Sequence, residues 1–303
     1  MAGTAVRTPL VRLPDPGGRE IHLKLECLQP VGSFKIRGAA NAILRLPPER
    51  LAAGVWTASA GNMAQGVAWC ARRLGIPCAV VVPDGAPRAK RDAVERLGAR
   101  TIPVPFERWW TVLTEGSYPG LDGLFVHPFA DADVLAGNGT IGLEILEDLP
   151  DCDAILVPFG GGGLSCGIAS AVRELSSGAR VFACEVETAA PLTAAFAAGA
   201  PVRVERRPSF VDGIGSSSVM EEIWPLAKSL LAGSRAVSLD AVATAIRRLA
   251  ATARVVAEGA GAAAVAAATA DDAPEGKLVC VVSGGVIDAR VFADVLSGAT
   301  PVV

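Results

Sequence analysis

Short apolar runs alternate with helical patterns along most of the chain, and this alternation restricts the fold more than any other feature. An apolar run at 55–58 precedes a helical pattern over 62–74 that ends at Gly75. A second apolar run follows at 78–82, and another helical pattern leads to a run at 100–104. Helices that connect consecutive strands form right-handed crossovers, which place those strands parallel in one sheet. The pattern therefore predicts an α/β fold.

The same alternation returns later in the chain without repeating the sequence. The later elements are a strand at 154–157, a helix near 164–175, a strand at 180–184, helices near 189–198 and 221–231, a helix capped by Asp240, an alanine-rich helix after Glu258 and a strand at 277–282. A chain of 303 residues has room for two lobes of this kind. We expect each lobe to be an open, mostly parallel sheet flanked by helices, with a large lobe at 1–51 and 133–303 and a small lobe at 52–132.

The charge balance argues against a nucleic-acid partner. The 28 basic and 31 acidic residues give a net charge of −3, and no Lys/Arg-rich block is present to neutralise a phosphate backbone. The first thirty residues lack the apolar stretch and cleavage site of a secretory signal, and the most apolar stretch, 259–270, is too short to cross a bilayer. We expect a cytoplasmic protein that binds neither nucleic acid nor membrane.

The usage of cysteine and histidine narrows the chemistry further. Seven scattered cysteines without a Cys-x-x-Cys pair indicate neither a disulfide framework nor a zinc site, and we expect buried, reduced thiols. The two histidines, His22 and His127, are too few to favour a Ser-His-Asp triad or a multi-histidine metal site. We expect structural roles for both.

Lys35 lies in the run Gly-Ser-Phe-Lys-Ile-Arg-Gly at 32–38, between glycines and beside an aromatic ring. A lysine amine becomes a nucleophile at neutral pH only where its proton is easily lost, in an enclosed or electropositive surrounding. Phe34, Ile36 and Arg37 are side chains of the kind that such a surrounding needs. Most lysines are solvated surface charges, so this run needs support from other segments.

Four consecutive glycines at 160–163 stand between the strand at 154–157 and a helix. Residues without side chains let backbone N–H groups approach an anion, and the helix N-terminus adds its positive dipole end, so this loop predicts phosphate binding rather than a flexible surface loop. A dinucleotide is the competing ligand, because Glu185 ends the next strand where a ribose-binding acid would lie. The glycine pattern that starts at Gly161 reaches its last glycine one residue late, which favours a cofactor with a single phosphate.

Two further segments place small polar groups after strands. They are Ser-Ala-Gly-Asn-Met-Ala-Gln-Gly at 59–66 and Ser-Gly-Gly at 283–285. Ligands of open α/β sheets bind at the carboxyl ends of the strands, so we expect these segments, the glycine loop and Lys35 to converge on one ligand.

In this order, these segments resemble the fold-type II pyridoxal 5′-phosphate enzymes, which are similar in architecture to the β subunit of tryptophan synthase. Within them, the chain is similar to the serine/threonine dehydratases (ammonia-lyases) and their relative serine racemase. The resemblance is nearly full length and is carried by Thr8-Pro9-Leu10, Lys24-Leu25-Glu26, 32–38, 59–66, His127-Pro128-Phe129, 137–140, 160–164, Asp212-Gly213-Ile214, 258–263 and 283–285.

The resemblance implies a role for each matching residue. Lys35 should form a Schiff base with the aldehyde of pyridoxal 5′-phosphate, and Phe34 should pack on its ring. The other cofactor-binding residues implied are Asn62 at the phenolic oxygen, Gly160, Gly161, Gly162 and Gly163 at the phosphate with Leu164 beside them, and Ser283 at the pyridine nitrogen. The substrate-binding residues implied are Ser59, Ala60, Gly61, Asn62 and Met63. A neutral serine does not hold the ring nitrogen protonated, which favours elimination over transamination.

The reaction implied is β-elimination, a dehydration and deamination of a 3-hydroxy amino acid, L-threonine or L-serine, to a 2-oxo acid and ammonia. Lys35 would remove the Cα proton as general base. Another pyridoxal phosphate reaction, either racemisation or β-replacement, and a catalytically silent relative remain as alternatives. We expect a homodimer.

Several positions depart from the pattern of the family. Ala60 stands where racemases carry a second serine, and a methyl group cannot transfer a proton, so dehydration is favoured over racemisation. Glu185 aligns with a metal-binding glutamate, but Pro191 aligns with the partner aspartate, which leaves a divalent-cation site incomplete. Met63 and Val286 replace a histidine and an asparagine, and we expect both to reshape the pocket.

Overall fold

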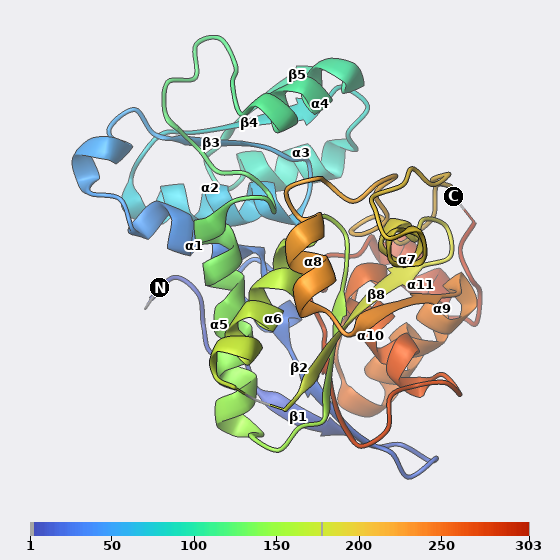
Figure 1. Ribbon diagram of the computed structural model, residues 1–303. Coiled ribbons are helices and arrows are strands. Elements are labelled where there is room, and N and C mark those ends of the chain that lie inside the picture. Colours follow the sequence, from blue (N-terminus) through green and yellow to red (C-terminus); the bar gives the residue numbers. More distant parts are fainter. Residues whose placement is uncertain (1–2, 177, 303) are drawn as a thin grey trace. The chain divides into compact units, whose positions relative to one another are not determined.

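The chain folds into two compact units in a computed structural model that describes residues 3–176 and 178–302 (Figure 1). Unit 1 consists of Met1–Val6 and Gln29–Asn138, and unit 2 consists of Arg7–Leu28 and Gly139–Val303. The lobe boundaries expected from the sequence stay a prediction.

Unit 1 is built on a four-stranded parallel sheet with the strand order β5-β4-β3-β6. In chain order its elements are α1 (Lys35–Leu44), the 3₁₀ turn η2 (Pro48–Leu51), β3 (Val55–Ala58), α2 (Asn62–Leu74), β4 (Cys78–Pro83), α3 (Arg88–Glu95), β5 (Arg100–Val104), α4 (Phe106–Glu115), β6 (Leu124–Phe125) and the start of α5 (Ala132–Asp148). The predicted helix at 62–74 and the predicted strands at 55–58, 78–82 and 100–104 are confirmed, with β4 extending to Pro83.

Both faces of this sheet are covered, as expected for parallel strands. Successive side chains of a strand point to opposite faces. In β4, Val81 belongs to the apolar cluster that contains Val112 of α4, whereas Val80 belongs to the cluster that contains Ala68 of α2. Helix α1 packs against α2, which is one of the helices that flank the sheet.

Unit 2 contains a six-stranded sheet with the order β1-β2-β10-β7-β8-β9, in which β1 and β2 pair antiparallel and the other neighbours pair parallel. Besides the end of α5, its elements are β1 (Leu10–Leu13), β2 (Glu20–Lys24), the 3₁₀ turn η1 (Glu26–Leu28), β7 (Ala154–Pro158), α6 (Gly163–Glu174), β8 (Arg180–Val186), α7 (Pro191–Ala198), α8 (Trp224–Leu230), β9 (Gly233–Val237), α9 (Leu239–Arg248), the π turn η3 (Leu249–Ala253), α10 (Gly259–Thr269), β10 (Lys277–Val281) and α11 (Ala289–Leu296). The predicted α/β class, with mostly parallel sheets flanked by helices, is confirmed.

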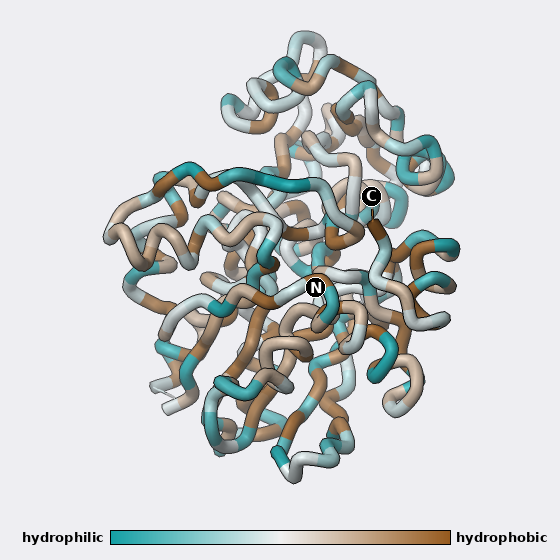
Figure 2. Tube along the Cα trace, turned by 90° about the vertical axis from the view of Figure 1, so that its right-hand side faces the viewer, coloured by the Kyte–Doolittle hydropathy of each residue, from teal (hydrophilic) through white to brown (hydrophobic). Residues whose placement is uncertain are grey.

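The alanine-rich helix α10 lies in the core of unit 2, where it contacts β7, β8, β9 and β10. Its small side chains permit close packing: a Cβ on Gly261 would lie 2.3 Å from the carbonyl oxygen of Gly284. In Figure 2 the hydrophobic stretches of the chain run through the interior, while many of the outer loops are hydrophilic. Across the described ranges, the helices fall short of the length and apolar character that a membrane span requires.

One helix begins differently from the sequence prediction. The sequence predicts Asp240 as the cap, whereas α9 begins at Leu239 and the hydroxyl of Ser238 accepts the N–H of Ala241 at 3.1 Å. Ser238 has the extended backbone of an N-cap residue, so it performs the capping. Asp240 lies instead in the first turn, where a negative charge is favourable to the helix dipole.

Candidate active site

Lys35 is the first residue of α1, and its side chain is partly buried. Nζ donates a 2.7 Å hydrogen bond to the carbonyl oxygen of Pro128 and lies 5.1 Å from the centroid of the Phe34 ring. The amine is therefore held in a defined direction by polar and aromatic neighbours. The role of Lys35 as a nucleophile stays a prediction.

The N-terminal part of α2 lies next to the backbone of Lys35. A Cβ on Gly66 would lie 3.2 Å from the carbonyl carbon and oxygen of Lys35, so glycine at this position permits the contact. Asn62 lies four residues before Gly66, on the same face of α2. The start of α2, which contains Asn62, and the turn before it therefore lie close to Lys35 within unit 1.

The turn that precedes α2 follows directly on β3. The hydroxyl of Ser59 accepts the N–H of Gly61 at 3.2 Å, which shapes the turn. The Met63 side chain is buried in the apolar cluster of unit 1 that also contains Ile36, and Ala60 packs against a second apolar cluster. The predicted substrate contacts of these residues stay a prediction.

Pro128 has no role in the sequence-based prediction, although it accepts the hydrogen bond from Lys35. It is separated from the lysine by 93 positions, so no local pattern points to the contact. The available signal was its place in the His-Pro-Phe segment at 127–129, to which the sequence assigned no function.

The glycine loop of unit 2 connects β7 with the N-terminus of α6. Gly162 has a φ of +86°, and a Cβ there would lie 2.5 Å from Cγ2 of Ile223 and 3.1 Å from the Phe159 ring. Only glycine fits this position without strain or collision. At Gly160 a Cβ would meet its nearest neighbour at 3.4 Å. The loop therefore presents bare backbone at the start of a twelve-residue helix, the geometry that binds a phosphate group.

Ser283 lies two residues beyond β10 and is buried, with 3% of its surface exposed. Hydrogen bonds fix the backbone of the residues before and after Ser283. Val282 donates its N–H to the carbonyl of Lys24 at 2.9 Å, and the carbonyl of Gly284 accepts the N–H of Glu258 at 3.0 Å. Because β10 and β7 are parallel neighbours, Ser283 and the glycine loop follow the same edge of the sheet.

The cysteines are free, and five of the seven are buried. Burial raises the pKa of Cys166, in the first turn of α6, to about 12. Burial also raises the pKa of the partly buried Cys27 to about 12. Since the thiolate is the nucleophilic form of cysteine, these thiols are inert at neutral pH and do not compete with Lys35 as nucleophiles.

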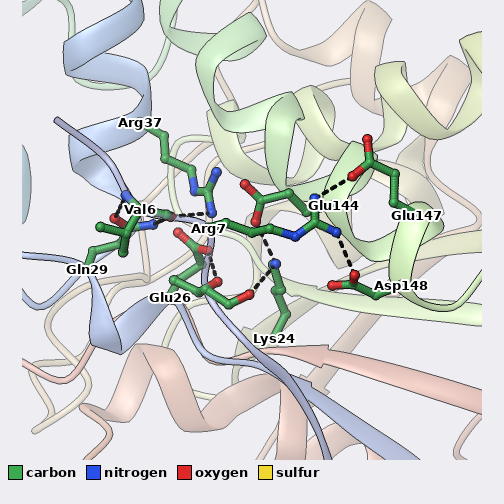
Figure 3. Close-up of polar contacts among 10 residues, drawn as sticks. Val6, Arg7, Lys24, Glu26, Gln29, Arg37, Glu144, Glu147 and Asp148 are labelled. Carbon is green, nitrogen blue, oxygen red and sulfur yellow. Dashed lines mark hydrogen bonds and ion pairs between the residues drawn. The ribbon is translucent and has the colours of Figure 1, made fainter. Parts of the chain in front are cut away.

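Lys24 belongs to a buried polar network and is a different kind of lysine from Lys35 (Figure 3). Its fully buried Nζ donates to the carbonyl oxygen of Thr8 at 2.7 Å and to Glu144 at 2.6 Å. The hydroxyl of Thr8 donates to Glu26 at 2.6 Å. Removing one partner of a buried ion pair destabilises a protein by about 3–5 kcal/mol. Lys24 is therefore a structural residue, fixed by its carboxylate partner.

Glu185, which aligns with the metal-binding glutamate of relatives, is buried and fully engaged in hydrogen bonds. One carboxylate oxygen accepts the N–H of Leu192, and the other accepts the N–H and hydroxyl of Thr193 and the hydroxyl of Ser234, all at 2.8 Å. Three of these four donors address one carboxylate oxygen, so Glu185 acts as an acceptor that joins β8 to α7 and β9. The incomplete divalent-cation site expected from the sequence stays a prediction. No group of three or more His, Cys, Asp or Glu side chains within 3–176 and 178–302 has the arrangement of a metal site.

We expect Glu185→Gln to lower the free energy of unfolding by about 2–3 kcal/mol, because an amide cannot replace the carboxylate as acceptor for every donor. Thermal or urea unfolding measures this loss. The exposed Glu187, which accepts the N–H of Leu239, is a matched control, and Glu187→Gln should change stability by less than about 0.5 kcal/mol. Mg²⁺, Ca²⁺ and EDTA should leave the melting temperature of the wild type unchanged. A rise of several degrees on adding Mg²⁺ that Glu185→Gln abolishes would contradict this account.

Comparison with known proteins agrees with the geometry of both units. A family model described as pyridoxal-phosphate dependent enzyme matches residues 2–284. L-threonine ammonia-lyase of Thermotoga maritima is 42% identical over 284 residues, which cover 92% of this chain and 70% of that protein. Serine racemase of Oryza sativa subsp. indica is 32% identical over 289 residues, covering 91% of this chain and 83% of that protein. Among solved structures, maize serine racemase superposes with a TM-score of 0.88 at 30% identity, covering 97% of this chain and 92% of that one.

Proposed function

The chain belongs to the family of pyridoxal-phosphate-dependent enzymes, and we propose that it is a lyase that converts a 3-hydroxy amino acid, L-threonine or L-serine, into a 2-oxo acid and ammonia. The observation that carries this proposal is the partly buried amine of Lys35, held by Pro128 beside the Phe34 ring. The similarity to L-threonine ammonia-lyases supports the type of reaction. Intact Lys35, Asn62 and Ser283 argue against a catalytically silent relative.

The described residues of each unit fit the chemistry of pyridoxal phosphate. We propose that Lys35, Phe34 and Asn62 in unit 1 and the glycine loop and Ser283 in unit 2 are cofactor-binding residues. The bare backbone at Gly162, where a side chain would collide with Ile223, supports a phosphate site. When bound, the cofactor supplies an aldehyde that condenses with amines and a ring that withdraws electrons from the Cα of the substrate.

Lys35 is proposed to act as the base. A neutral amine that donates one N–H to Pro128 keeps its lone pair for the Cα proton of the substrate. The turn at 59–61 lies at the N-terminus of the thirteen-residue helix α2, a favourable place for a substrate carboxylate. The neutral hydroxyl of Ser283 would donate a hydrogen bond to the ring nitrogen without protonating it, which favours loss of the β-hydroxyl over transamination.

Product analysis with a set of substrates tests this proposal. In the presence of pyridoxal phosphate, we expect L-threonine to give 2-oxobutyrate and L-serine to give pyruvate, each with an equal amount of ammonia. L-Alanine, which lacks a leaving group on Cβ, should give neither product. Failure to form a 2-oxo acid from both hydroxy amino acids would refute the proposal.

Ala60 is expected to limit racemisation. The wild type should form much less D-serine than pyruvate from L-serine, because the methyl group of Ala60 cannot return a proton to the opposite face of Cα. Ala60→Ser should increase the yield of D-serine relative to pyruvate, whereas the size control Ala60→Gly should not. Chiral chromatography of the products measures the ratio. Racemisation by the wild type at a rate equal to elimination would contradict this reading.

A homodimer and a cytoplasmic location also stay proposals for this chain. Sedimentation velocity of the protein with its cofactor tests the first of these.

A further inference from the structure

The segment that leaves β6 is fixed to β3 before it reaches the active lysine. Val126 donates its N–H to the carbonyl of Trp56 at 2.8 Å, and the buried hydroxyl of Thr57 donates to the carbonyl of Val126 at 2.8 Å. His127 follows directly. The turn that it opens therefore starts from a fixed position on the sheet of unit 1.

His127 caps this turn with its side chain. Its Nδ1 accepts the N–H of Phe129 at 3.2 Å and the N–H of Ala130 at 2.8 Å. A ring nitrogen that accepts hydrogen bonds carries no proton, so these bonds assign the neutral ring with its proton on Nε2. A proton on Nδ1 would face two donors and open the turn.

Two aromatic rings fix the orientation of the imidazole. Phe125 and Phe129 lie edge-on to it, with ring centroids at 5.9 Å and 4.8 Å and interplanar angles of 85° and 90°. Edge-to-face pairs of this kind have preferred geometries and restrict the rotation of the rings. The acceptor at Nδ1 is thereby kept in line with the backbone of the turn.

Pro128 lies between the two residues whose positions these contacts fix. It is buried, and its carbonyl lies in the same planar peptide unit as the N–H of Phe129, so the hydrogen bond from that N–H to Nδ1 of His127 also orients the carbonyl. That carbonyl accepts the hydrogen bond from Nζ of Lys35 at 2.7 Å. The position of the amine therefore depends on the turn, and the turn depends on the acceptor of His127.

We propose that His127 is a positioning residue for the catalytic amine: by accepting two backbone N–H groups, it holds the Pro128 carbonyl at which Lys35 docks whenever its amine is free. This inference rests on the proposed function and adds to it the residue that orients the base. A misplacement of a reacting group by about 1 Å reduces a rate by about 100-fold. A shift of the turn that moves the Lys35 amine should therefore lower kcat.

Two substitutions distinguish the effect of the Nδ1 acceptor of His127 from the effect of its aromatic ring. His127→Phe keeps an aromatic ring beside Phe125 and Phe129 but loses the acceptor. His127→Asn loses the ring contacts but keeps an oxygen in reach of the N–H groups two and three residues further on, as in an Asx turn. If the acceptor matters, the asparagine variant retains function and the phenylalanine variant does not.

The first readout is the kinetics of ammonia release from L-threonine. We expect His127→Phe to lower kcat by about 10- to 100-fold with little change in KM, and His127→Asn to remain close to the wild type. The second readout is the rate at which acetic anhydride labels the Lys35 amine in the cofactor-free chain, relative to the exposed Lys228 of the same molecule. Lys35 should be labelled slowly in the wild type and in His127→Asn, and faster in His127→Phe.

Either of two results overturns the inference. One is wild-type kcat and wild-type labelling of Lys35 in His127→Phe. The other is a lower kcat and faster labelling of Lys35 in a folded His127→Asn variant, a result that requires no measurement on His127→Phe. Labelling requires no turnover, so it tests the docking of Lys35 independently of whether the wild type releases ammonia.

Discussion

Replacing Lys35 with alanine should abolish both ammonia release and the visible absorbance of the bound cofactor. General base catalysis alone contributes about 10²- to 10⁴-fold, and the same amine is the group that would link covalently to the cofactor. We therefore expect kcat to fall by at least about 10³-fold. The fold should persist, because Lys35 is the first residue of α1 and only partly buried.

Lys228→Ala is the matched control for this substitution. Lys228 is exposed, and its amine lies 5.6 Å from the centroid of the Trp224 ring, which resembles the contact between Lys35 and Phe34. It should keep wild-type turnover and absorbance. A Lys35→Ala variant that retains the absorbance band and full turnover would remove the basis for the proposed mechanism.

Gly162→Ala should weaken cofactor binding by about 10- to 100-fold, which corresponds to about 1.4–2.8 kcal/mol. Alanine at a φ of +86° is strained, and its Cβ would lie 2.5 Å from Ile223, so the loop must move. Strain of this kind amounts to about 1–3 kcal/mol. The loss should appear in fluorescence titration with pyridoxal phosphate and as a lower melting temperature of the cofactor-free chain.

Gly160→Ala places the same methyl group two residues earlier in the loop. There a Cβ meets nothing closer than 3.4 Å, an ordinary van der Waals contact. We expect the melting temperature of the cofactor-free Gly160→Ala chain to match that of the wild type. Equal melting temperatures for Gly162→Ala and the wild type, with equal cofactor affinity, would show that the loop conformation does not depend on glycine.

Local patterns in the sequence were sufficient to predict β3, α2, β4 and β5 of unit 1. The predicted bounds of β3, α2 and β5 agree with the structure, because apolar periodicity and helix-ending glycines act within a few residues. Gly75, for example, ends α2 with a φ of +66°, a conformation that glycine adopts without strain.

Elements that depend on distant partners were not predicted. β9 has a weak apolar pattern and exists as a strand because it pairs with β8 at the edge of the sheet. β6 contains two residues that pair with β3, which lies almost seventy positions earlier. The cap of α9 was predicted wrongly at Asp240, since Ser238 and Asp240 both suit a helix start and the backbone conformation decides between them.

The candidate site shows the same difference between residues that a local motif predicts and groups that only the fold brings together. Lys35 and the glycine loop were predicted from short motifs whose residue types carry the chemistry. The carbonyl of Pro128 was missed because any residue has a carbonyl, and only the fold selects which one lies near the amine. The hydrogen bonds to Glu185 were likewise not predicted, because their donors come from α7 and β9 and only the fold brings them to the carboxylate.

Borohydride reduction of the protein with its bound cofactor, followed by peptide mapping, tests the central claim most directly. The reduction fixes pyridoxal phosphate to the amine that holds it, and the chain offers five lysines, at positions 24, 35, 90, 228 and 277. The account predicts one modified lysine, Lys35. Modification of another lysine in its place, or no modification of a protein that releases ammonia from L-threonine, would contradict it.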